Sequence, residues 1–234
     1  MGRSGGVSTG RYESLNLSYW VGDWMRDVDL NWQRARTLMA PRVAFAMLNQ
    51  IHGNAVHTVT DSYSIARPDG DGMVTAASNL ILCIFTADCV PILLADFRRP
   101  IVGALHAGWR GTLAGIALQG VAAMERLGAS AADIEAVMGP SIGPCCYEVN
   151  SELADRFAQG FPDSSRHIRP GPPDKAYLDL CGFNADQLAA AGLKPDNIRS
   201  AGPCTRCTSE SYFSRRAAGG ATTGLQLSFI GLVG

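Results

Sequence analysis

Cys89 and His106 are the residues of this sequence whose types and positions most directly suggest chemistry. Each stands at the end of an apolar run, Cys89 just before residues 90–95 and His106 just after residues 101–105. A thiolate and an imidazole are preferred ligands of zinc, and the same pair can act as nucleophile and base in a cysteine hydrolase. Either chemistry requires the two side chains to lie within contact distance of each other.

Three short apolar runs predict the strands that position these two residues. Residues 80–85, 90–95 and 101–105 are rich in Ile, Val and Leu and are bounded by turn residues. If residues 97–100 close a tight hairpin, His106 faces Pro91, and Cys89 lies diagonally across from His106 on the same face. Diagonal neighbours are about 7–8 Å apart, so two side chains could reach one metal ion. A register slip of one residue would place them on opposite faces.

The remaining sequence predicts helices mixed with strands. Apolar residues recur at helical spacing in residues 23–40, 112–127 and 179–191. Further strands are expected at residues 44–50, 56–60, 134–138 and from Ile198. Residues 160–175 are rich in Pro, Gly, Asp and Ser and predict a loop. His52 falls in the turn between two predicted strands, where it becomes a candidate ligand only alongside Cys89 and His106.

Basic residues at three places are candidates for binding an anion. Arg3 stands in a glycine-bearing segment whose backbone amides could help to hold one. Arg110 lies between a strand and a helix, where free N–H groups and the helix dipole favour phosphate. Arg215 and Arg216 follow an aromatic pair. A solvated basic residue is the alternative interpretation at each position.

The seven cysteines are odd in number and lack a regular framework, which favours a reducing compartment over a set of disulfides. Adjacent Cys145 and Cys146 point apart in an extended chain and are expected to be core or loop thiols. Cys204 and Cys207 have the C-x-x-C spacing of a redox pair or half a zinc ribbon. Neither context is evident in the sequence, so neither role is predicted.

Composition sets the wider limits. A chain of 234 residues with a hydrophobic fraction of 47% can bury a full core, and we expect a single domain over residues 1–234. A formal net charge of -1 gives no general attraction to nucleic acid or anionic lipid. No apolar leader and no stretch of about 20 apolar residues is present, so we expect a cytoplasmic protein with no membrane or nucleic-acid partner.

Six motifs, in order along nearly the whole chain, closely resemble one family. They are RSGGVS at residues 3–8, QIHG at 50–53, ADCVP at 87–91, HAGWRG at 106–111, GPSIGPCCY at 139–147, and CT at 204–205 followed by YFSRR at 212–216. The family is the laccase-domain or multicopper polyphenol oxidase family, whose members are now mostly described as zinc-dependent purine nucleoside phosphorylases.

The resemblance implies a fold, a metal site and a reaction. The fold is α+β, a four-layer α/β/β/α sandwich with mixed β-sheets, and the implied Zn2+ ligands are His52, Cys89 and His106. The implied partners are phosphate and a purine nucleoside: adenosine, inosine or methylthioadenosine. Adenosine deaminase activity is also expected, because zinc-bound water can attack the purine and Asp88 is the nearest candidate to move protons. The oligomeric state stays open.

The C-terminal motif departs from the family pattern in two places. The family's tyrosine between Ser214 and the arginine pair is missing, and Leu225 stands where an arginine is usual. Arg3, Arg110 and Arg216 are the predicted phosphate-binding residues, but this departure leaves Arg215 as an alternative to Arg216.

Three other functions remain open. A polyphenol oxidase of the four-copper laccase type needs about ten histidines, and this chain has 4, although copper at the Cys-His-His site could oxidise phenols weakly. A cysteine hydrolase could use Cys89 and His106. Zinc could also serve only to hold the fold, with the family's reported link to cell-wall precursor editing acting through partners. Three mixed ligands with an open fourth position favour catalytic zinc.

Overall fold

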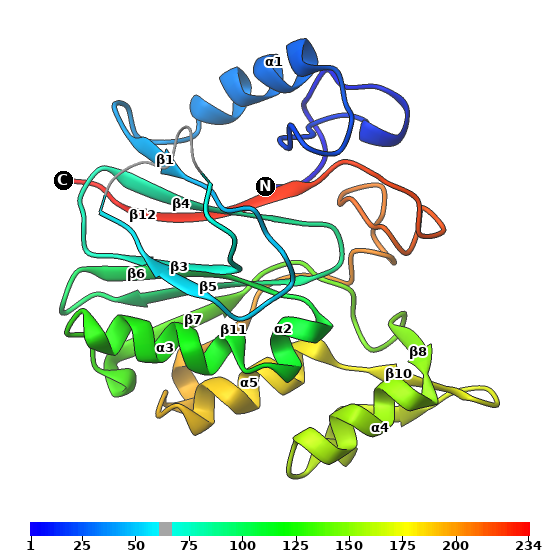
Figure 1. Ribbon diagram of the computed structural model, residues 1–234. Coiled ribbons are helices and arrows are strands. Elements are labelled where there is room, and N and C mark those ends of the chain that lie inside the picture. The colour runs from blue at the N-terminus through cyan, green and yellow to red at the C-terminus, as the bar shows by residue number, and fades with distance from the viewer. Residues whose placement is uncertain (61–66) are drawn as a thin grey trace.

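The computed structural model describes residues 1–60 and 67–234, and it arranges them in four layers (Figure 1). Helix α1 (Met25–Arg36) covers one face of a three-stranded sheet. That sheet packs on a six-stranded sheet, and further helices cover the outer face of the larger sheet. Both sheets are mixed, because each contains parallel and antiparallel pairs. The predicted four-layer α+β sandwich is confirmed.

The small sheet is built around its central strand, β4 (Leu80–Thr86). This strand pairs in parallel with β1 (Ala44–Ala46) and antiparallel with β12 (Gln226–Leu232). Its side chains alternate: three pack against the larger sheet and three against α1, namely Leu80, Leu82 and Ile84 on one face and Ile81, Cys83 and Phe85 on the other. Because both faces of β4 are covered, its residues 80–85 are all apolar.

The larger sheet has the strand order β11-β7-β5-β6-β3-β2. Its strands are β2 (Val56–Thr58), β3 (Gly72–Thr75), β5 (Val90–Asp96), β6 (Ile101–Ala107), β7 (Ile134–Met138) and β11 (Ile198–Ser200). In the β5–β6 hairpin Pro91 pairs with His106, so the predicted register is confirmed. Cys89, which directly precedes β5, therefore lies diagonally across from His106.

Helices α2 (Trp109–Leu113), α3 (Ile116–Arg126) and α5 (Leu180–Ala190) cover the outer face of the larger sheet (Figure 1). The prediction of one helix over residues 112–127 is wrong. Gly115 has a φ of 79°, a left-handed conformation that glycine adopts without a steric penalty, and it breaks the helix in two.

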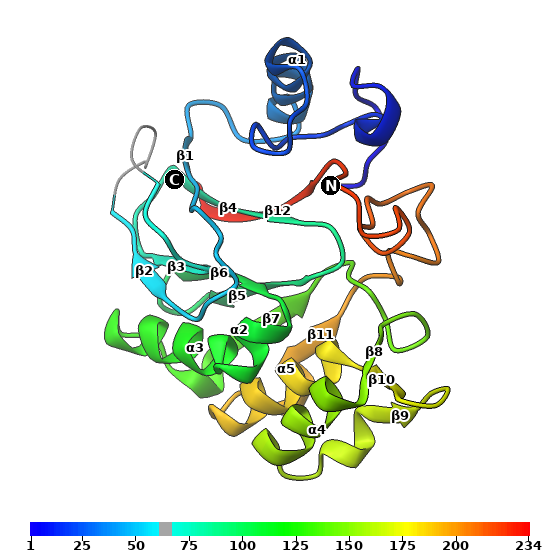
Figure 2. The same ribbon diagram turned by 45° about the vertical axis from the view of Figure 1, so that its right-hand side comes forward.

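A third, small sheet lies beside α4 (Ser151–Gly160) and was not predicted (Figure 2). Its order is β8 (Glu148–Asn150), β10 (Lys175–Leu178) and β9 (Ile168–Pro170). The loop predicted at residues 160–175 is wrong where it includes β9, because a three-residue strand gives no periodic signal. Among the described residues, four short 3-10 helices accompany these elements: Gly10–Tyr12, Ala131–Asp133, Ser164–Arg166 and Pro195–Asn197.

The strand predicted at residues 44–50 is also too long, since pairing with β4 ends at Ala46. Residues 47–55, between β1 and β2, then pass from the small sheet to the larger one and carry His52. Within the described residues, no helix combines the length and the apolar character that crossing a membrane requires.

Candidate metal and substrate site

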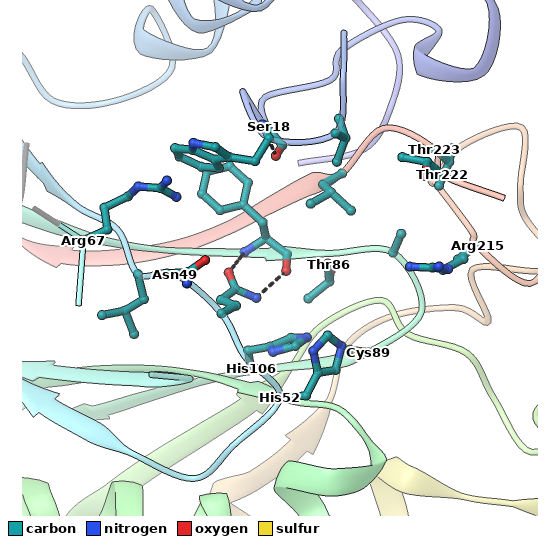
Figure 3. Close-up of a pocket in the computed structure, with 17 residues that line it drawn as sticks. Ser18, Asn49, His52, Arg67, Thr86, Cys89, His106, Arg215, Thr222 and Thr223 are labelled. Carbon is teal, nitrogen blue, oxygen red and sulfur yellow. Dashed lines mark hydrogen bonds between the residues drawn. The ribbon is translucent and has the colours of Figure 1, made fainter. Parts of the chain in front are cut away.

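The three predicted metal ligands meet at one end of the sheets (Figure 3). His106 lies on β6, Cys89 directly precedes β5, and His52 lies in the loop between β1 and β2. One donor atom from each residue lies within 4.8 Å of the others. The rings of His52 and His106 meet edge to face, with centroids 4.8 Å apart. The hairpin register therefore brings together three side chains that could hold one ion.

Asp71 orients two of these ligands and was missed by the sequence analysis. It directly precedes β3, across from the end of β6, and its buried carboxylate accepts a hydrogen bond from His106 Nδ1 at 2.7 Å. The same carboxylate accepts the backbone N–H groups of Ile51, His52 and Gly53. Because His106 Nδ1 is engaged, its Nε2 is the nitrogen left for a metal.

The electrostatics of the cluster favour a thiolate. Burial alone raises the pKa of the Cys89 thiol, but the neighbouring His106 and His52 rings lower it to about 6. Burial also lowers the pKa of His106, whereas Cys89 and Asp71 raise it to about 9. Each group thus favours the charged form of the other, a thiolate beside an imidazolium, and a thiolate is the form of cysteine that binds a metal ion.

Gly108 makes room for two of the ligands. A Cβ at this position would lie 2.9 Å from His52 Cδ2 and 3.1 Å from Cys89 Sγ, both too close for ordinary packing. His52 itself has a φ of 61°, an uncommon conformation for a residue with a side chain. Its backbone N–H is held by Asp71 at 3.0 Å. Gly108, the first glycine of HAGWRG, thus allows His52 and Cys89 to lie close to this turn.

A cavity of about 280 Å³ opens beside the three ligands (Figure 3). The aromatic rings of Trp20 and Phe85 line it, and they meet edge to face. Arg67 also lines it, with its guanidinium over the Trp20 ring. Thr86 Oγ1 is buried in its wall and has no hydrogen-bond partner among the described residues. A buried hydroxyl without a partner is a position where a bound molecule could supply one.

Of the four arginines considered for phosphate binding, only Arg215 is in the lining of this cavity. Arg215 lines it, and its Nε donates to Gly220 O at 3.0 Å. The guanidinium of Arg216 is held by the carbonyl oxygens of Cys146 and Glu148, over the Tyr147 ring. The two arginines thus differ in position: Arg215 lines the cavity, whereas Arg216 binds backbone carbonyl oxygens.

Arg3 and Arg110 lie outside the cavity wall. Arg3 donates to the carbonyl oxygens of Glu13 and Ser209, so it joins the N-terminal segment to the segment after β11 (Figure 2). The Arg110 guanidinium lies over the Trp109 ring, 4.3 Å from its centroid. Both carry structural contacts, and their role toward phosphate stays a prediction.

Asp88 is the neighbour of Cys89, but its carboxylate is engaged elsewhere. One oxygen accepts the hydroxyl of Thr205 at 2.7 Å, and the other accepts the backbone N–H of Arg216 at 2.7 Å. Its φ of 91° fits a sharp turn between β4 and β5. Asp88 therefore anchors the segment after β11, and its predicted part in proton transfer stays a prediction.

The donor set matches zinc better than a group of coppers. The other two histidines lie apart from the site: His57 contacts the Asp69 carbonyl, and His167 contacts the Asp186 carboxylate. Two imidazoles and one thiolate, with Asp71 behind one imidazole, fit a single ion with an open position. They do not supply the histidines that a four-copper centre needs.

Comparison with known proteins agrees with this geometry. The family described as multi-copper polyphenol oxidoreductase laccase matches residues 1–233. The purine nucleoside phosphorylase YlmD of Geobacillus stearothermophilus is 37% identical over 240 residues, covering 98% of this chain and 87% of that protein. Adenosine deaminase RL5, from an unknown prokaryotic organism, is 35% identical over 218 residues, covering 89% and 83%. The crystal structure of YlmD has a TM-score of 0.93 at 35% identity, covering 100% of this chain and 90% of that one.

Proposed function

This chain belongs to the multi-copper polyphenol oxidoreductase laccase family, and from that premise we propose that it is a zinc-dependent purine nucleoside phosphorylase. Its relatives named as purine nucleoside phosphorylase and adenosine deaminase support an enzyme of this family. The observation that carries the proposal is the aromatic-lined cavity that opens directly onto His52, Cys89 and His106. A nucleoside bound there would place its reacting atoms beside the ligand cluster.

His52, Cys89 and His106 would hold the zinc ion. A neutral imidazole and a thiolate are required for this, and because Asp71 engages His106 Nδ1, Nε2 is the nitrogen that would bind the ion. When bound, zinc supplies a Lewis acid at the inner end of the cavity. Copper in the same ligand set is the alternative that the family's older name suggests.

The cavity walls provide for the two parts of a nucleoside. Trp20 and Phe85 offer aromatic surfaces on which a purine can pack, and the unpartnered Thr86 hydroxyl offers a hydrogen bond. A cavity of about 280 Å³ is near the lower end of the range for small-molecule sites, about 300–1,000 Å³. We propose adenosine, inosine and methylthioadenosine as substrates.

Phosphate would enter on the side of the segment after β11. In phosphorolysis a phosphate oxygen attacks the ribose C1′, the bond from C1′ to the purine nitrogen breaks, and the purine leaves with the electron pair and takes up a proton. Arg215, which lines the cavity, would hold the phosphate by its charge and by its terminal N–H groups. Arg3, Arg110 and Arg216 are the further predicted contributors of positive charge.

Adenosine deamination is a second candidate activity, and the similarity to an enzyme named adenosine deaminase favours it. Asp88 is the carboxylate next to the cluster in the chain, and we keep it as the candidate for proton transfer. A cysteine hydrolase is also supported by one observation: Asp71, His106 and Cys89 are arranged as orienting acid, base and nucleophile. Metal content separates that reading from the others.

The proposal is tested by incubating zinc-loaded protein with inosine, with and without phosphate. We expect hypoxanthine and ribose 1-phosphate only when phosphate is present. The matched variant is Cys89→Ala, which should lose one equivalent of zinc and this activity together. Base release without phosphate would indicate hydrolysis, and a full equivalent of zinc in Cys89→Ala would show that the ligand assignment is wrong.

A further inference from the structure

A second cluster of metal-binding side chains lies outside the cavity just described. Its four members are Cys145, Cys146, Cys204 and Cys207, whose sulfur atoms all lie within 4.8 Å of one another. All four are free thiols. Cys145 and Cys207 are exposed, so the cluster is open to ions in solution.

We propose that these four cysteines bind one zinc-class metal ion as a closed tetrathiolate site. Four thiolates in tetrahedral arrangement select zinc or iron, and four protein ligands with no open position are typical of structural rather than catalytic zinc. Nothing in the proposed phosphorylase reaction requires this second ion, so the two proposals stand or fall separately.

The distances between the sulfur atoms fit a tetrahedron around an ion. Zinc–sulfur bonds of about 2.3 Å place the sulfurs of a regular tetrahedron about 3.8 Å apart. Here Cys207 Sγ lies 3.6 Å from Cys145 Sγ and 3.4 Å from Cys146 Sγ. A disulfide would bring two sulfurs to about 2.05 Å. The observed separations are therefore much closer to shared coordination than to a covalent pair.

Backbone conformation explains why adjacent cysteines can act together. Cys145 and Cys146 lie in a turn closed by hydrogen bonds from the N–H groups of Cys146 and Tyr147 to Gly143 O. A turn lets neighbouring side chains lie on one side, whereas the expectation that they point apart assumed an extended chain. The sequence therefore favoured core or loop thiols over a metal pair at these two positions.

The C-x-x-C segment brings the other two sulfurs together in a second turn. The N–H group and the hydroxyl of Thr208 both donate hydrogen bonds to Cys204 O, which closes the chain around residues 204–208. Residues three apart in such a turn can lie on one side. The sulfurs of Cys204 and Cys207 lie within 4.8 Å of each other and of those of Cys145 and Cys146.

The proposed ion would join two segments that already contact each other. Residues 139–147 meet the segment after β11 through the Ser141–Cys204 bridge, the hydrogen bond from Thr205 N to Ser141 O and the hydrogen bond from Arg216 to Cys146 O. The second segment carries Arg215, which lines the cavity, and Thr205, which contacts Asp88. An ion held by both segments would fix the position of this wall of the cavity.

The test uses the whole protein in the Cys89→Ala background, so that the first site does not contribute. Reduced, metal-free protein is titrated with Co2+ in the absence of oxygen, and we expect one equivalent to give intense thiolate-to-cobalt charge-transfer bands and tetrahedral d–d bands. Adding Cys207→Ser should abolish the four-thiolate spectrum. Cys181→Ser is the matched control: its half-buried thiol contacts Ser141 rather than the cluster, and the spectrum should persist.

Zinc counting on protein with an intact Cys89 gives an independent measurement if the double variant does not fold. We expect two equivalents of zinc in the unaltered protein and one in Cys207→Ser. Absence of bound cobalt in folded, reduced Cys89→Ala protein would overturn the proposal. An unchanged zinc count in Cys207→Ser would overturn it as well.

Discussion

Replacing Asp71 with asparagine removes the charge that joins two of the three proposed ligands. One carboxylate oxygen accepts His106 Nδ1 and the His52 N–H, and the other accepts the N–H groups of Ile51 and Gly53. Asparagine keeps the shape of the side chain but only one acceptor oxygen. Its amide NH2 group must then face either His106 or the loop that carries His52, and both present donors.

The magnitude follows from the bonds that are lost. Two of the four hydrogen bonds to Asp71 lose their acceptor, and bonds to a charged group contribute about 1.5–3 kcal/mol each. Outer-shell partners of a metal-bound histidine are worth about 10- to 100-fold in metal affinity. This corresponds to about 1.4–2.8 kcal/mol of binding free energy. We therefore expect Asp71→Asn to remain folded but to bind zinc at least tenfold more weakly.

The assay is zinc dissociation measured by competition with a chromophoric chelator, with circular dichroism to confirm the fold. Asp69→Asn is the matched control, because it makes the same change two residues away on an exposed side chain that accepts a hydrogen bond from Asn49. A zinc affinity of folded Asp71→Asn within twofold of the unaltered protein would refute this reasoning. Equal weakening in both variants would point to a general loss of negative charge instead.

Three further variants test other parts of the structure. Gly108→Ala should weaken zinc binding by about 5- to 150-fold, since overpacking costs about 1–3 kcal/mol. Gly160→Ala is the control and should leave zinc binding unchanged, because its added Cβ would lie an ordinary 3.6 Å from Leu113. Asp88→Asn should slow adenosine deamination at constant zinc content, and unchanged turnover would remove Asp88 from proton transfer. Burial raises the pKa of Asp96, but the N–H groups of Ser130, Arg99 and Arg98 and the Arg99 guanidinium lower it. The ionised Asp96 carboxylate therefore stabilises the fold above the unfolded pKa of about 3.9, and this stabilisation is lost as the pH falls through the lower folded pKa. Asp96→Asn should lower the free energy of unfolding by about 1.5–3 kcal/mol at pH 7 and by much less in acid. Urea unfolding at the two pH values measures this difference.

The hairpin that brings Cys89 and His106 together could be predicted from the sequence because its information is local. Two apolar runs joined by a short turn at residues 97–100 leave few possible registers, and the apolar pattern selects among them. The structure has the predicted pairing of Pro91 with His106. The family's motifs then supplied His52, which the structure places within 4.8 Å of the other two donor atoms.

The residues that were missed depend on contacts between distant segments. Asp71 is the last residue of a Pro-Asp-Gly-Asp sequence that is typical of an ordinary turn. Its role depends on the pairing of β3 with β6 beside His106. Cys145 and Cys204 are brought together by the bridge between Ser141 and Cys204, and no local sequence pattern predicts this bridge. Trp20 and Thr86 line the same cavity from the N-terminal segment and the end of β4. A single sequence gives no register for such pairings.

The single-domain organisation stays a prediction.

Cys89 and His106 cannot serve metal binding and nucleophilic attack at the same time. A thiolate that binds zinc has committed its lone pair to the ion, and His106 must lose its proton to offer Nε2. A cysteine hydrolase needs the opposite state, with a free thiolate beside a protonated imidazole. Asp71 supports His106 in both states, so the geometry of these three residues does not distinguish them. His52 does distinguish them, because its ring adds a third donor and is held in a left-handed backbone conformation by Asp71. A cysteine hydrolase does not need the His52 ring as a third donor, whereas the proposed metal site does. The metal content of freshly purified protein therefore separates the two reaction classes before any substrate is tried.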